Sequence, residues 1–121
     1  MARTVPVRVR WLRRAQDDMA ELLVYIATFE RGDPDARFVS ITQAVNDLRS
    51  APESTRHWRI LQGKTYRLLI VEKRFLVPYI YYPPAVNRRA GLISIRAVRH
   101  GLRRAPLRGV HEIPRMPMRD S

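Results

Sequence analysis

The chain has 121 residues, a formal net charge of +12 and no cysteine. This length predicts one domain with a core of its own. The missing cysteine excludes disulfides and thiolate metal sites, and nothing indicates an oxidising compartment. No apolar run approaches the roughly 20 residues of a membrane span, and the N-terminus lacks the apolar core of a signal peptide. We therefore expect a cytoplasmic protein that does not enter a membrane.

The charge is unevenly distributed along the chain. Residues 1–53 hold eight basic and eight acidic side chains, whereas residues 54–121 hold fifteen basic and three acidic ones. All of the excess positive charge therefore lies in the second part of the chain. Such an asymmetry favours a polyanionic partner, either nucleic acid or an acidic protein. The alternative is a solvated basic surface without a special partner.

The first predicted element is a strand at the N-terminus. Apolar and polar residues alternate from Val5 to Trp11, with Arg8 and Arg10 at polar positions. A period of two is typical of a strand with one buried face. Pro6 cannot donate a backbone hydrogen bond, which places it at the start of the strand or on a sheet edge.

Two helices follow, joined by a short turn. Apolar residues recur at spacings of three and four from about Arg14, and Gly32 is the expected terminator. Asp33 and Pro34 then have the residue types of an N-cap and a first helical residue. So short a turn predicts an antiparallel helical hairpin whose apolar face covers a sheet. The expected stripes are Ala15, Met19, Leu22, Leu23, Ile26 and Phe29, and then Phe38, Ile41, Val45 and Leu48.

Three strands make up the rest of the predicted domain. Runs rich in Leu, Ile, Val, Phe and Tyr cover residues 64–71, 75–82 and 92–100. Short connections between them favour antiparallel neighbours. Residues 58–61 are either a short strand or the start of the next one. The predicted fold class is α+β: an N-terminal strand and an antiparallel helical hairpin packed on a small antiparallel sheet, which a three-stranded meander completes.

Two features of the predicted sheet can be checked directly. Pro78 lies inside an otherwise regular strand, so we expect a bulge or an unpaired stretch there. Alternation in the last strand predicts one buried face and one polar face. These faces are Ile93, Ile95 and Ala97 on the first, and Ser94, Arg96 and His100 on the second.

The end of the chain differs in composition from the rest. From Gly101 onwards it is rich in arginine and proline and has no helical period. We expect a single domain over residues 1–104, followed by an extended or flexible tail over residues 105–121.

Cations on the predicted strands decide which chemistry is open to the chain. It has no phosphate-binding loop or nucleophile elbow, and its three histidines lack the spacing of a metal site, so we expect neither metal nor cofactor. If the cations converge, they can bind a phosphate backbone, and a histidine or lysine could then move protons for RNA cleavage through the 2′-hydroxyl. The alternative is a solvated basic face beside one ordinary histidine. The cations concerned are Lys64, Arg67, Arg96, Arg99, His100 and Arg103.

The order of the elements, the small size and the basic sheet together resemble the RelE/ParE superfamily of toxins from type II toxin–antitoxin systems. The likeness covers about residues 5–104, and the order and spacing of its motifs make it specific. The motifs are Val9-Arg-Trp11, Ala15, Asp18, Ile26-Ala27, Asp33-Pro34-Asp-Ala36, Leu48-Arg-Ser-Ala-Pro52, Tyr66-Arg67-Leu68-Leu69, Phe75 to Tyr82 and Ile95 to Arg103.

The resemblance implies one of two activities. RelE-like members cleave mRNA in the ribosomal A site, whereas ParE-like members share the fold and poison DNA gyrase. The ending His100-Gly101-Leu102-Arg103 is similar to the ParE group, and Gly101 stands where the nucleases usually place a tyrosine. The resemblance therefore implies a gyrase inhibitor that is not an enzyme. The alternative is a metal-independent, ribosome-dependent endoribonuclease with Arg67 and His100 as its catalytic residues.

Each alternative implies the same first partner. That partner is a cognate acidic antitoxin, whose amphipathic segment would lie across the helices and the basic sheet. An inert relative that keeps only antitoxin binding is a third alternative, and a homodimer and a heterotetramer with the antitoxin both remain open. The cations Lys64, Arg67, Arg96, Arg99, His100 and Arg103 would bind the target, which is DNA gyrase or the ribosome and its mRNA. The long Pro83–Ala90 connection departs from the family pattern and has no assigned role.

Overall fold

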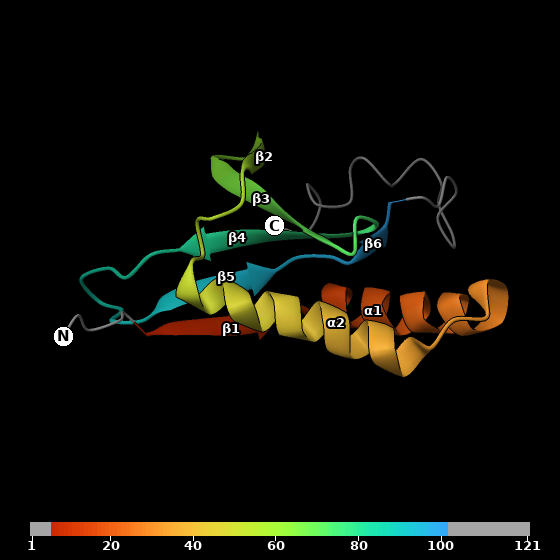
Figure 1. Cartoon of the computed structure of the whole chain (residues 1–121). Helices are drawn as coiled ribbons and strands as arrows, with labels where there is room; N and C mark the ends of the chain where they lie inside the picture. Colours follow the sequence, from red (N-terminus) through yellow and green to blue (C-terminus); the bar gives the residue numbers. More distant parts are fainter. Residues whose placement is uncertain (1–5, 102–121) are drawn as a thin grey trace.

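Two helices pack on one face of a six-stranded sheet (Figure 1). The computed structural model describes residues 6–101, so the predictions for Val5, Arg103 and the tail lie outside the described residues. The strand order is β1-β5-β4-β3-β2, and β6 pairs with β4. None of the described helices is both long and apolar enough to cross a membrane. The predicted α+β class is confirmed.

The elements follow one another in the predicted order. The first helix continues into a π-helical turn, and the second ends in a 3₁₀ turn. The helices are α1 (Arg13–Tyr25) with η1 (Ile26–Glu30), and α2 (Pro34–Asp47) with η2 (Leu48–Ser50). The strands are β1 (Val7–Trp11), β2 (His57–Leu61), β3 (Lys64–Val71), β4 (Phe75–Tyr82), β5 (Gly91–Ile95) and β6 (Arg99–His100).

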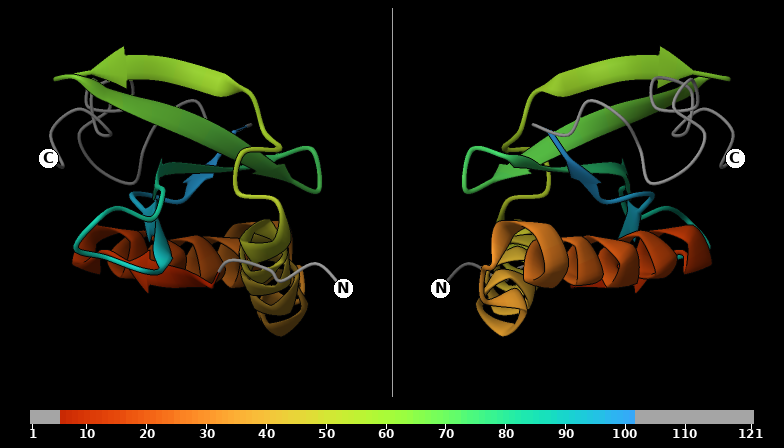
Figure 2. Two further views of the ribbon diagram at one scale, coloured as in Figure 1. Left: turned by 90° about the vertical axis from the view of Figure 1, so that its left-hand side faces the viewer. Right: turned by 90° about the vertical axis from the view of Figure 1, so that its right-hand side faces the viewer.

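The sheet is mixed rather than wholly antiparallel. Strands β2, β3, β4 and β5 form antiparallel neighbours, as their short connections predict. Strand β1 instead runs parallel to β5, with Val7 beside Gly91 and Trp11 beside Ile95. The long chain between these two strands, which includes both helices, makes a parallel pairing available. Figure 2 shows β2 and β3 on the side of the molecule away from the helices.

The end of the first helix departs from the predicted apolar stripe. Ala15, Met19, Leu22 and Ile26 are buried, but Phe29 is 68% exposed, so its predicted place in the stripe is wrong. A π-helical turn has more residues per turn than an α-helical turn, so each residue rotates by a smaller angle about the helix axis. Residue 29 therefore faces away from the sheet. The turn ends at a residue with left-handed backbone, after which the Gly32 N–H donates to the Ile26 carbonyl over 3.2 Å.

The second helix begins as its sequence predicts. Asp33 is the N-cap, and its Oδ1 accepts the Ala36 N–H over 3.2 Å. Ile41, Val45 and Leu48 are buried against the sheet, whereas Phe38 is 45% exposed. The antiparallel helical hairpin is therefore confirmed, with one member of the second stripe turned largely outward.

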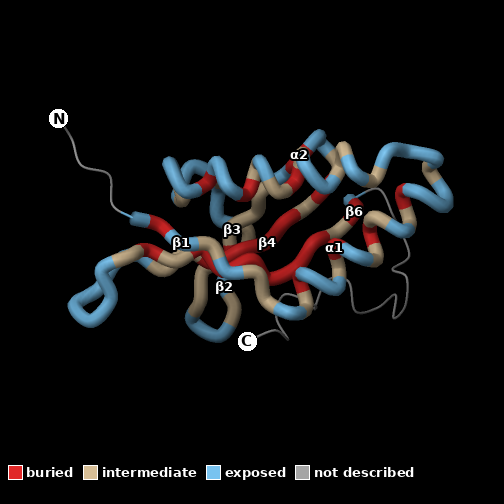
Figure 3. The backbone as a smooth tube through the Cα atoms, turned by 90° about the horizontal axis from the view of Figure 1, so that it is seen from below, coloured by how far each residue is buried: buried red, intermediate tan, exposed pale blue. Residues whose placement is uncertain are grey.

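One face of the sheet holds the core. Strand pairing places Arg67, Leu69 and Val71 opposite Tyr79, Val77 and Phe75, and it carries this face across to Ile93 and Ile95. The helices cover this side, which we call the helix face. Figure 3 shows the buried residues concentrated along β4, β5 and the inner sides of the helices. The alternate residues, Lys64, Tyr66 and Leu68 among them, lie on the opposite face.

The last predicted strand is broken into two. β5 ends at Ile95 and β6 begins at Arg99, so β4 has no strand partner on that side at Val77 and Pro78. Pro78 lies at this interruption. Proline has no backbone N–H, and no strand on this side of β4 needs that donor. The predicted unpaired stretch is therefore found on this side only: Pro78 pairs with Leu68 of β3, and its carbonyl accepts the Arg96 N–H over 3.0 Å. The break also shifts the alternation: Ile93, Ile95 and Ala97 are buried as predicted, but His100 pairs with Phe75 and lies on the helix face.

Candidate functional site

The structure separates the predicted cations into groups that do not converge. Arg67 and His100 both lie on the helix face, and they pair with different parts of β4: Arg67 with Tyr79, just past its middle, and His100 with its first residue, Phe75. Four residues along a strand correspond to roughly 13 Å. The two residues also lie on opposite sides of β4. One small substrate group therefore cannot contact both side chains in this arrangement.

Arg67 forms hydrogen bonds with the loop that leads into β2. Its Nη1 donates to the carbonyl of Glu53 over 3.2 Å and to the carbonyl of Thr55, and its Nη2 lies 3.0 Å from His57 Nε2. The Glu53 carboxylate adds an ion pair at 3.8 Å. Only 13% of the side chain is exposed. Arg67 therefore has a structural task that its place in the sequence did not indicate.

Tyr79 holds the same loop beside Arg67. Its hydroxyl donates to the Pro52 carbonyl over 2.8 Å and lies 2.6 Å from Thr55 Oγ1. Burial raises the pKa of this hydroxyl above its ordinary value of 10.0. It therefore stays protonated and serves as a hydrogen-bond donor near neutral pH.

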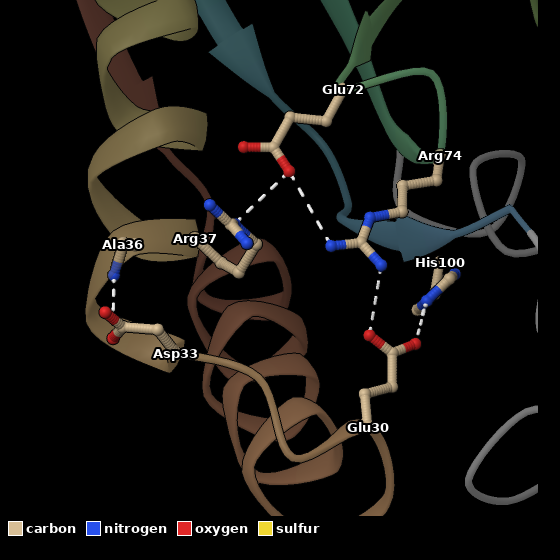
Figure 4. Close-up of polar contacts among 7 residues, drawn as sticks. All are labelled: Glu30, Asp33, Ala36, Arg37, Glu72, Arg74 and His100. Atoms are coloured by element: carbon tan, nitrogen blue, oxygen red, sulfur yellow. Dashed lines mark hydrogen bonds and ion pairs between the residues drawn. The ribbon is translucent and has the colours of Figure 1, made fainter.

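His100 belongs to a polar network at the start of β4 (Figure 4). Its Nε2 lies 2.6 Å from Oε2 of Glu30, whose second oxygen accepts from Arg74 Nη1 over 3.1 Å. The imidazole also packs edge-on against the rings of Phe75 and Tyr25, and only 3% of the side chain is exposed. The network therefore ties the end of the first helix to β4 and β6.

The network extends to the second helix. Glu72 Oε1 lies 3.7 Å from Arg74 Nη2 and 3.2 Å from Arg37 Nε. Figure 4 shows these side chains pointing toward one another from the helical hairpin and the β3–β4 turn. The carboxylates alternate with the cations, so each charge has an opposite neighbour. His100 is thus surrounded by partners rather than presented to a substrate.

Asp18 makes a third polar contact between a helix and the sheet. Its Oδ2 accepts the Val98 N–H over 3.1 Å, at the break between β5 and β6. Burial raises the pKa of the Asp18 carboxyl from 3.8 to about 6, although the Val98 hydrogen bond and the nearby Arg14 and Arg99 oppose the increase. The carboxyl therefore loses its proton close to neutral pH.

The remaining predicted cations do not join Arg67 or His100, although Arg99 lies near Asp18. Lys64 starts β3 on the opposite face, and Arg99 lies beside Leu76 in the β6–β4 pair. Arg96 is buried, with its guanidinium 5.7 Å from the centre of the Tyr66 ring and its Nη1 3.4 Å from Ser94 Oγ. Arg103 lies outside the described residues. Among residues 6–101, no group of three or more His, Cys, Asp or Glu side chains could hold a metal ion.

Two arginines that sequence reasoning left out of the site occupy a more open position. Arg8 and Arg10 are exposed on β1 and, with Arg88, line a hollow of about 410 Å³. The signal was present in the sequence, because both occupy the polar positions of the alternating strand. In the sequence, Arg8 and Arg10 indicate only a strand, because alternation alone does not show which neighbours surround them.

Comparison with known proteins adds a structural relative. No protein-family model matches the sequence, and no curated protein does. The chain is similar to a chain in the solved structure of the chromosomal ParDE TA system from P. aeruginosa, with a TM-score of 0.55 and 17% sequence identity. The match covers 80% of this chain and 96% of that chain. The protein described here therefore shares its fold with a component of a ParDE toxin–antitoxin system.

Proposed function

We propose that this chain is the toxin of a toxin–antitoxin pair and that it inhibits DNA gyrase by binding it. The shared fold with a chain of a ParDE TA system carries the toxin part of the proposal. The gyrase target follows from the resemblance of the His100-Gly101-Leu102-Arg103 ending to ParE-like toxins. Both gyrase and the alternative ribosomal target are cytoplasmic, so the proposal places the chain in the cytoplasm.

The placement of Arg67 and His100 supports an inhibitor over a nuclease. A nuclease that uses both residues needs them beside one scissile phosphate, with donors and proton-transfer groups within hydrogen-bond reach. Here each side chain is engaged by its own partners, at different parts of β4. RNA cleavage by this pair would require both clusters to open, whereas binding to a protein target does not.

The antitoxin would be an acidic protein with an amphipathic segment. The chain carries a net charge of +12, so complementary charge would speed association and make it sensitive to salt. Exposed apolar side chains on the helical hairpin, including Val24, Phe29 and Val39, offer contacts for the apolar side of such a segment.

The proposal is tested with purified gyrase and relaxed plasmid. We expect the purified chain to inhibit supercoiling in a concentration-dependent way, and the acidic protein encoded beside it to reverse the inhibition. As a control, ribosomes programmed with a defined mRNA are incubated with the same preparation. Normal supercoiling at saturating protein would contradict the proposal, and ribosome-dependent mRNA cleavage would replace it with the endoribonuclease alternative.

A further inference from the structure

A basic hollow lies at the start of β5, between β1 and the connection that precedes β5. Its lining comes from two segments that are far apart in the sequence. Strand β1 contributes Arg8, Val9 and Arg10, and the second segment contributes Arg88, Ala90, Gly91 and Leu92. The volume is about 410 Å³, and none of the described residues that line it is acidic. The hollow therefore combines apolar side chains with three guanidinium groups.

Arg8 and Arg10 are the least engaged of these groups. Within residues 6–101, neither side chain makes a hydrogen bond or an ion pair, and both are exposed. Arg67 and Arg74, in contrast, contact carbonyl or carboxylate oxygens at several points. Arg8 and Arg10 lie two residues apart on one strand, so both side chains project from the same face of the sheet, with Cα atoms roughly 6.6 Å apart.

Arg88 is held in place by its own loop. Its Nη2 donates to the Pro83 carbonyl over 2.6 Å, its Nε donates to the Ala90 carbonyl over 3.2 Å, and its guanidinium lies 5.9 Å from the centre of the Tyr82 ring. A guanidinium has five N–H groups, so three remain for a ligand. The Pro83–Ala90 connection thus fixes the Arg88 guanidinium at the edge of the hollow.

The hollow offers donors from side chains rather than from the backbone. Residues of β1 that face β5 are already paired, as shown by the Gly91 N–H donating to the Pro6 carbonyl and the Leu12 N–H donating to the Ile95 carbonyl. The outer side of β1 is the edge of the sheet and takes no part in this pairing, whereas the hollow is defined by the side chains that line it. A phosphate needs only N–H donors and positive charge, and guanidinium groups supply both. The three guanidinium groups of the hollow therefore match the chemistry of a phosphate.

We propose that this hollow binds the phosphodiester backbone of a nucleic acid, with Arg8 and Arg10 contacting successive phosphates and Arg88 fixing one of them. A polymer with a regularly repeating charge can meet two arginines spaced along a strand. The apolar side chains of Ala90 and Leu92 would then lie against the sugars. Such contacts set affinity and orientation without reading sequence. This binding is independent of whether gyrase is the target.

The test measures binding of the full chain to a fluorescein-labelled single-stranded oligodeoxynucleotide by fluorescence anisotropy, between about 50 and 200 mM salt. The informative variant is Arg8→Gln with Arg10→Gln. The matched control is Arg56→Gln with Lys73→Gln, which removes the same charge from exposed positions outside the hollow. Thermal unfolding of all three proteins verifies that they are folded.

Each outcome bears on the proposal. Two lost phosphate contacts should lower the slope of log K against log salt concentration by about 1.4, since each contact to a single strand contributes about 0.7. The control should keep the slope of the original chain. Equal slopes for the two double variants would overturn the proposal, as would no binding of the oligonucleotide. If a poly-glutamate peptide bound more tightly than the oligonucleotide and the hollow variant lost that binding instead, the hollow would be a carboxylate site.

Discussion

Arginines in two regions of this fold differ in what surrounds them. On β3 and in the β3–β4 turn, Arg67 and Arg74 contact carbonyl and carboxylate oxygens. At the β1 edge, Arg8 and Arg10 make no such contacts within the described residues. The side-chain chemistry is the same in both regions. The acceptors around each guanidinium therefore separate arginines that hold the fold from those that remain available to a ligand.

This difference changes which residues should be altered to study function. A change at Arg67 affects the loop with which it forms hydrogen bonds, so lost activity there would reflect lost structure. A change at Arg8 or Arg10 removes charge without removing a hydrogen bond or ion pair to any residue in the described range 6–101. Substitutions at these arginines and at their carboxylate partners test this division.

Replacing Arg67 with methionine should lower the free energy of unfolding by about 3 kcal/mol. The substitution removes the charged donor of the part-buried Thr55 carbonyl and of the exposed Glu53 carbonyl, and hydrogen bonds to charged groups contribute roughly 1.5–3 kcal/mol. Urea denaturation followed by circular dichroism measures the loss, with exposed Arg56→Met as the matched control. A loss no larger than that of the control would contradict the structural role of Arg67.

Replacing Glu30 with glutamine should lower the free energy of unfolding by about 2 kcal/mol at neutral pH. The carboxylate accepts from both His100 and Arg74, and hydrogen bonds to charged groups contribute roughly 1.5–3 kcal/mol. The control is Asp17→Asn, which removes a surface ion pair with Arg13 and should cost under about 1 kcal/mol. If the two variants were equally stable, the network around His100 would have no structural weight.

The buried carboxyl of Asp18 should make the free energy of unfolding depend on pH. Folded Asp18 keeps its proton up to about pH 6, whereas the unfolded chain releases it near pH 3.8. The folded state therefore binds more protons in this window, so the contribution of Asp18 to the free energy of unfolding falls as the pH rises from about 4 to 6. The carboxylate then costs of order 1–3 kcal/mol above that range.

Asp18→Asn should abolish this fall, because its amide oxygen can still accept the Val98 N–H without ionising. Urea denaturation at pH 4, 5, 6 and 7 compares the two proteins. The variant should gain stability relative to the original chain as the pH rises. A constant difference across the series would show that Asp18 does not titrate in this window.

The double change of Arg8 and Arg10 to glutamine should have the smallest effect, within about 0.5 kcal/mol of the original free energy of unfolding. Both side chains are exposed and make no internal contact within residues 6–101. The same urea titration measures it. A loss approaching that of Arg67→Met would remove the distinction between the two regions.

The sequence predicted the elements that depend on local rules. Alternation placed Ile93 and Ile95 in the core, Asp33 has the residue type of an N-cap, and Pro78 indicated an interruption in pairing. These outcomes follow from strand period, side-chain capping and the missing proline donor.

The sequence could not predict features that depend on contacts across the fold. Nothing local indicates the π-helical turn that exposes Phe29, or the break after Ile95 that moves His100 to the helix face. The partners of Arg67 come from a loop ten or more residues earlier in the chain, and Glu30 reaches His100 from 70 residues away. A strand arginine and a nearby histidine therefore suggested one site, whereas the structure gives them separate partners.

We propose that this chain acts on gyrase by binding rather than on RNA by catalysis. The most direct measurement follows plasmid topology and translation in a sensitive host during the first minutes after induction of the chain. The account predicts loss of supercoiling and DNA breaks while translation continues. Translation arrest with cut mRNA and unchanged supercoiling would contradict it, and would require Arg67 and His100 to act in catalysis despite their separate partners.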